Sequence, residues 1–144
     1  MPASTQPAPL PFAGKWKLKD VKAASEAPPA LVPREGTMVF TQEPDGIHLI
    51  AETVYTNGQK RRVDSTFRLD GSSYPVIGSL IADALNARQA DAQSMEITMT
   101  QEGRVAGKVS PVLSDSGNLM TTRWEIIPAE GTPFTFTTVS EREK

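Results

Sequence analysis

Short stretches in which apolar and polar residues alternate, separated by glycine-containing turns, run through most of this chain. The stretch SMEITMTQ at 94–101, for example, places Met95, Ile97 and Met99 on one face of a strand and polar residues on the other. Turn signals lie between such stretches at Asn57-Gly58, Asp70-Gly71 and Glu102-Gly103. This pattern predicts an all-β fold, an antiparallel up-and-down barrel of about eight to ten strands.

The alanine- and leucine-rich stretch 76–93 allows a second interpretation. Apolar residues recur in it at helical spacing, at Leu80, Ile81, Ala84 and Leu85. The stretch therefore fits either a short helix near 79–90 or a strand over roughly 83–88, and both stay open. Neither outcome changes the fold class.

The length of 144 residues predicts one domain, which we place at 12–144. Residues 1–11 contain four prolines and are expected to form a flexible N-terminal lead-in. This lead-in lacks the basic and apolar regions of a signal peptide. The protein is therefore either cytoplasmic, or periplasmic or secreted after removal of a signal peptide.

Composition excludes several classes of function. The net charge of −2 and the absence of cysteine argue against a nucleic-acid partner, a thiolate nucleophile and a cysteine-ligated zinc site. No apolar run has the ~18 residues that a membrane span needs. His48 is the single histidine, so we predict no metal site, and no cofactor motif is present.

Two motifs carry a resemblance to a known family. Gly14-Lys15-Trp16 begins the first predicted strand, and DGSSYPVIG follows at 70–78. In this order, along nearly the whole chain, they resemble small bacterial lipocalin-like proteins of the calycin type. The resemblance implies a barrel, a small apolar ligand and no fixed chemistry. It also implies that Trp16 closes the barrel beneath an arginine of a late strand, either Arg123 or Arg142, of which we favour Arg142 because the last strand should meet the first.

The turn at 57–58 decides which face of the stretch 47–56 points into the barrel, and two registers fit the sequence. A two-residue loop places His48, Glu52 and Arg61 among apolar neighbours, because residues that pair across a hairpin share a face. That arrangement is a polar cluster of the kind that acid–base catalysis uses.

A three-residue loop, 56–58, with glycine at its left-handed third position, reverses this assignment. Apolar residues then share the inward face, and charged residues share a solvated outer face. The inward set is Ile47, Leu49, Ala51, Thr53, Tyr55, Val63, Ser65, Phe67 and Leu69, and the outer set is His48, Glu52, Arg62, Asp64 and Arg68. Burying three ionisable groups without partners costs several kcal/mol, so we favour the three-residue loop.

Aromatic side chains and flexible methionines suit an adaptable pocket for a hydrophobic molecule. The expected ligand-binding residues are Phe40, Tyr55, Phe67, Tyr74, Met99, Met120 and Trp124. Candidates for a catalytic acid or base are Tyr55, His48 and Asp64.

We therefore expect the barrel to bind a small hydrophobic or aromatic molecule, and a homodimer is left open. The alternative is a cofactor-free enzyme, such as a lyase, isomerase or cyclase, with acid–base residues inside the same barrel. A third interpretation is a structural or interaction protein with a filled core, and a filled interior with no cavity of a few hundred Å³ would remove the other two. The register of the hairpin distinguishes the binding protein from the enzyme.

Overall fold

The computed structural model describes residues 12–23, 27–28, 31–44, 46–79, 81–128 and 132–143. The predicted lead-in at 1–11 and Leu80 lie outside the described residues. Every statement below concerns the described part of the chain.

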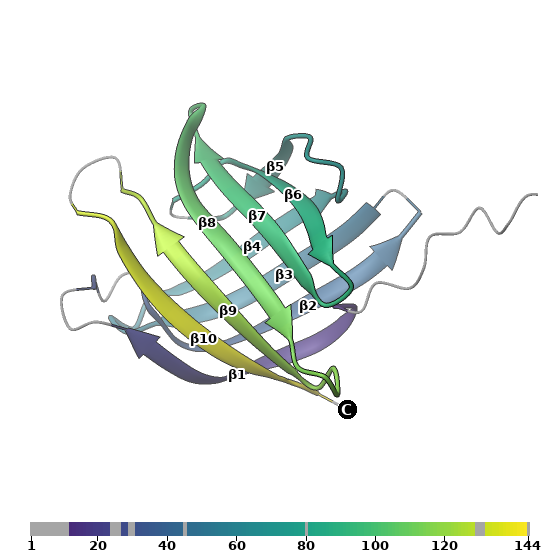
Figure 1. Cartoon of the computed structure of the whole chain (residues 1–144). Coiled ribbons are helices and arrows are strands. Elements are labelled where there is room, and N and C mark those ends of the chain that lie inside the picture. The colour runs from purple at the N-terminus through teal and green to yellow at the C-terminus, as the bar shows by residue number, and fades with distance from the viewer. Residues whose placement is uncertain are drawn as a thin grey trace, which may run out of the picture.

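Ten strands close into one antiparallel barrel within the described residues, and each strand pairs with its neighbours in sequence (Figure 1). β1 pairs with β10, which completes the ring. The strands are β1 (Gly14–Ala23), β2 (Pro33–Glu43), β3 (Gly46–Tyr55), β4 (Lys60–Phe67), β5 (Tyr74–Ile77), β6 (Ala84–Asp91), β7 (Ser94–Gln101), β8 (Arg104–Leu113), β9 (Leu119–Ile126) and β10 (Phe134–Arg142). The predicted fold class is confirmed.

Of the two alternatives for 76–93, the strand is confirmed and the short helix near 79–90 is wrong, because Ala84–Asp91 forms strand β6. Leu85 and Ala87 are buried, whereas Arg88 is exposed, so side chains alternate between the interior and the solvent. Pairing with β7 gives the two buried residues apolar partners on the adjacent strand. These contacts outweigh the helix propensity of alanine and leucine. No described helix is long and apolar enough to cross a membrane.

The hairpin between β3 and β4 has the three-residue loop. The backbone N–H of Tyr55 donates to the carbonyl of Gln59 at 2.8 Å, so these residues pair and 56–58 form the loop. Gly58 has a φ of 90°, a left-handed conformation that glycine adopts without steric cost. In the remaining pairs, odd-numbered residues of β3 also lie opposite odd-numbered residues of β4, so they share one face of the sheet. The favoured register is therefore confirmed, and the apolar face of the hairpin lines the interior.

A cation–π contact joins the first and last strands. Trp16 and Arg142 are partners in the β1–β10 pairing, and the guanidinium carbon of Arg142 lies 4.3 Å from the Trp16 ring centroid. Arg142 also donates from Nη1 to the Ala13 carbonyl at 2.5 Å and from Nε to the Gly117 carbonyl at 3.0 Å. Arg123, the other arginine considered, is exposed on β9.

Gly78, the last residue of the DGSSYPVIG motif, ends β5 in a left-handed conformation with a φ of 91°. A Cβ atom at this position would overlap the backbone oxygen of Arg62. Only glycine lets the chain pass β4 this closely.

We expect Arg142→Met to lower the free energy of unfolding by about 2–4 kcal/mol, because it removes a cation–π contact and charge-assisted hydrogen bonds. Urea-induced unfolding measures this loss. Arg123→Met is the matched control and should change stability by less than about 0.5 kcal/mol. Equal losses in the two variants would show that the contact with Trp16 does not stabilise the barrel.

Gly78→Ala should lower the free energy of unfolding by about 2–4 kcal/mol, because the methyl group clashes with backbone and φ is left-handed. Gly58→Ala is the control, since Gly58 has a φ of 90° and no atom within 4 Å of the position that a Cβ would take. It should cost only about 1 kcal/mol. Similar unfolding midpoints for both variants would contradict the clash.

Candidate functional site

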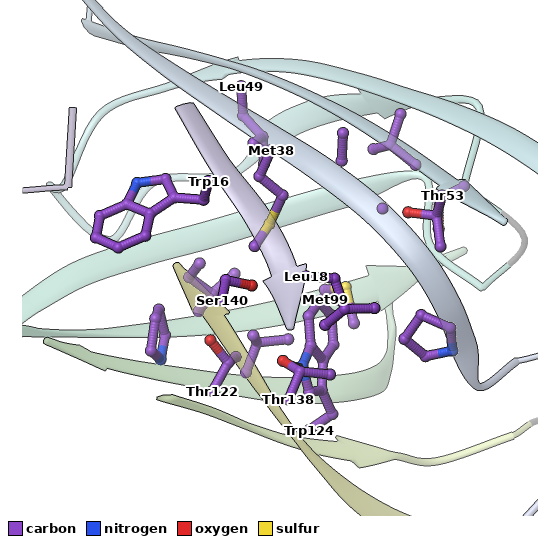
Figure 2. A pocket seen from close by; sticks show the side chains of 18 of the residues that line it. Trp16, Leu18, Met38, Leu49, Thr53, Met99, Thr122, Trp124, Thr138 and Ser140 are labelled. Carbon is purple, nitrogen blue, oxygen red and sulfur yellow. Dashed lines mark hydrogen bonds between the residues drawn. The ribbon is translucent and has the colours of Figure 1, made fainter. Parts of the chain in front are cut away.

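The barrel encloses an elongated cavity of about 170 Å³ between its strands. Its lining is mostly apolar and comes from the inward faces of strands that are far apart in the sequence (Figure 2). The β3–β4 hairpin contributes Leu49, Ala51 and Val63. The volume falls short of the few hundred Å³ set above for a drug-sized ligand, so the interior is neither that large nor filled and leaves space only for a smaller molecule.

The structure brings together five of the seven expected ligand-binding residues. Those that border the cavity are Phe40, Tyr55, Met99, Met120 and Trp124. Trp16 borders it as well.

The other two expected residues, Phe67 and Tyr74, do not border the cavity. Phe67 is fully buried and packs within the apolar core. The hydroxyl of Tyr74 donates to Asp70 Oδ2 at 2.7 Å, across the turn that leads into β5. This hydrogen bond lowers the pKa of Asp70 and raises the pKa of Tyr74.

Hydroxyl-bearing residues also border the cavity; of these, Thr53 was predicted to face inward, whereas Thr122, Thr138 and Ser140 were missed. Thr122 on β9 and Thr138 and Ser140 on β10 border the cavity, and each is only 2% exposed. Period-two alternation through Met120 and Trp124 already places Thr122 on the inward face, so the signal was present. Thr122 was missed because only apolar and aromatic residues were considered for the pocket.

The hydroxyl of Thr122 is an unpaired polar group in a buried place. Trp124 Nε1–H donates to Thr138 Oγ1 at 2.9 Å, which satisfies the neighbouring threonine. Thr122 Oγ1 has no hydrogen-bond partner among the described residues. An unsatisfied buried hydroxyl costs about 1–3 kcal/mol.

Aromatic rings form a layer at the same wall. The rings of Trp124 and Phe136 stack with centroids 5.6 Å apart and an interplanar angle of 9°. Phe134 stacks on Phe136 in turn, at 6.2 Å. Because Trp124 and Phe136 both border the cavity, these stacked rings form part of its wall.

Tyr55 is the single ionisable side chain among the described residues that border the cavity. Burial raises the pKa of the Tyr55 phenol, and the positive charge of Arg61 offsets part of this rise. The group is therefore neutral at physiological pH and can act there as a hydrogen-bond donor or acceptor.

His48 and Asp64, the other candidates for a catalytic acid or base, lie on the outer face of the barrel. His48 Nε2 is 2.8 Å from Asp64 Oδ1, and His48 Nδ1 is 3.8 Å from Glu43 Oε2. The cluster has no contact with the cavity lining of the hairpin, because it occupies the opposite face of β3 and β4. The described residues contain no group of three or more His, Asp or Glu side chains arranged to hold a metal ion.

A second hollow opens on the surface where β1 separates from β2. The pairing of these strands is limited to Gly14–Lys17 of β1, and the hollow borders the rest of that strand. Its lining includes the charged residues Lys19, Asp20 and Arg34. Leu18 and Pro33 border both hollows, so the two spaces adjoin there.

No family model matches this chain, and no curated protein matches its sequence. Its structure is similar to that of zebrafish ileal bile acid-binding protein complexed with cholic acid, with a TM-score of 0.54 and 10% identity over 92% of this chain and 99% of that chain. It is also similar to EF1p2_mFAP2b bound to DFHBI, with a TM-score of 0.50 and 12% identity over 92% of this chain and 94% of that chain. The likeness shows the fold alone, a closed antiparallel β-barrel of the kind that the two motifs implied.

The Tyr74→Phe variant leaves Tyr55 as the single tyrosine of the chain. We expect its tyrosinate absorbance to titrate with a midpoint above the ordinary value of 10.0, because burial disfavours the phenolate. A raised folded-state pKa stabilises the fold below pH 10 and loses this contribution as pH rises through the folded value. The same variant unfolded in urea provides the control, and a folded-state midpoint at or below the unfolded one would contradict the burial of Tyr55.

Proposed function

We propose that this protein binds a small hydrophobic or aromatic molecule in the interior of its barrel. The observation that carries the proposal is the cavity of about 170 Å³ with its mostly apolar lining. Apolar surface removed from water on binding supplies the driving force, at roughly 25 cal/mol per Å².

The size of the cavity limits the ligand. An engineered apolar cavity of about 150 Å³ in another protein holds a single benzene ring, so this interior suits a compact ring compound. The methionines Met38, Met99 and Met120 border the space, and their flexible thioether side chains can change rotamer to enlarge it.

The solved structures of similar fold support an interior site. Zebrafish ileal bile acid-binding protein was solved with cholic acid, and EF1p2_mFAP2b was solved bound to DFHBI. A closed barrel of this type offers its interior as the natural place for a ligand of small size.

The enzyme alternative has less support. His48 and Asp64 face outward, which leaves Tyr55 as the one proposed acid or base inside the barrel. A tyrosine whose pKa is raised by burial stays protonated at neutral pH and is a poor proton donor there. Because no observation favours a reaction, we develop the binding function alone.

A panel of benzene, toluene, indole and naphthalene tests the proposal by thermal unfolding. A compound present at about a hundredfold excess over its Kd should raise the Tm of the wild-type protein by roughly 5–10 °C. Ala51→Phe should abolish this shift, because the new ring occupies the cavity that Ala51 borders.

Ile50→Phe is the matched control, since Ile50 directly precedes Ala51 on β3 and does not border the cavity. It should respond to the panel as the wild type does. If Ala51→Phe does not fold, Ala51→Leu fills part of the same space and should weaken binding in the same direction. The proposal fails if no compound stabilises the wild type, or if cavity filling leaves the shift intact.

A further inference from the structure

One wall of the cavity carries hydroxyl groups within the mostly apolar lining. Thr122 on β9 and Thr138 on β10 pair directly across the two strands, and Ser140 is the next inward position of β10. Figure 2 shows the hydroxyl oxygens of these three residues gathered on one side of the space. They form a polar strip beside the ring of Trp124.

Thr122 differs from Thr138 because its hydroxyl is unpaired. Trp124 donates to Thr138 Oγ1, whereas Thr122 Oγ1 has no partner among the described residues although Thr122 is 2% exposed. Valine has the shape of threonine without the hydroxyl, so a barrel that only needed filling would be more stable with valine there. A ligand that forms a hydrogen bond with Thr122 offsets this cost when it binds.

The lining offers no charge to a ligand. Tyr55 is the single ionisable residue among the described residues that border the cavity, and its phenol is neutral at physiological pH. A carboxylate placed inside would lose its hydration and find no cationic partner. The interior therefore disfavours anions.

The aromatic layer and the unpaired hydroxyl belong to the same region of the wall. Trp124 follows Thr122 by two residues on β9, so both side chains point into the barrel. A ring packed on Trp124 therefore has the Thr122 hydroxyl at its edge, within reach of a substituent. The cavity of about 170 Å³ has space for one such ring.

We infer that the cavity takes a neutral single-ring compound that bears one hydroxyl group, a phenol-type ligand whose hydroxyl pairs with Thr122 and whose ring packs against Trp124. This inference rests on the proposed function. It adds the charge, the size and the polar anchor of the ligand.

Phenol and toluene test the polar anchor, because they have nearly the same size and differ in the hydroxyl group. Isothermal titration calorimetry of each compound is performed on the wild type, on Thr122→Val and on Thr121→Val, whose residue is exposed on the outer face of β9. Thr122→Val should weaken phenol binding about five- to twentyfold and change toluene binding by less than about twofold. Thr121→Val should change neither.

Two further measurements distinguish a hydrogen bond between Thr122 and the ligand from an effect of the shape of the Thr122 side chain. Thr122→Ser keeps the hydroxyl and should retain most of the affinity for phenol. Without ligand, Thr122→Val should unfold at a higher temperature than the wild type, because it removes an unpaired buried hydroxyl.

The outcomes distinguish this inference from the proposed function. Equal changes of phenol and toluene affinity in Thr122→Val, or no change in either, would overturn the anchor while the cavity still binds rings. Benzoate that binds as tightly as phenol would overturn the neutral ligand. If the wild type binds neither phenol nor toluene, the proposed function fails, and this inference fails with it.

Discussion

Neighbouring strands of a closed barrel fix each other's faces, because hydrogen-bonded partners must point to the same side. In this chain the three-residue loop at 56–58 sets that choice for β3 and β4. A slip of one residue would bring His48 and Glu52 inward and turn Ala51 and Tyr55 out to solvent. The apolar lining, the cavity and any ligand chemistry all depend on this register.

Because of this register, the charged groups of β3 and β4 lie on the opposite face of the sheet from the cavity. His48 and Asp64 form their hydrogen bond on the outer face of β3 and β4. What remains inside is a phenol, three buried hydroxyls, stacked aromatic rings and thioethers. These groups recognise shape and a single hydrogen bond far better than they transfer protons.

The alternation and the turn residues predicted the barrel, and the desolvation cost of ionisable groups predicted the hairpin register. Local propensity misled at 84–91, because the pairing of β6 with β7 depends on residues that no local pattern brings together. The placement of Phe67 outside the cavity lining depends on three-dimensional packing, which residue type does not reveal. Thr122 could have been found from its inward parity, but its missing partner appears only when both strands are in place.

Two features of the interior lower the stability of the protein: an unfilled space and an unpaired hydroxyl. Filling the space would improve packing, and replacing Thr122 with valine would remove an unsatisfied hydroxyl. Each change would raise the free energy of unfolding by an amount on the order of a few kcal/mol. Since the two costs fall beside the same aromatic ring, that of Trp124, one ligand that fills the space and pairs the hydroxyl would offset both together.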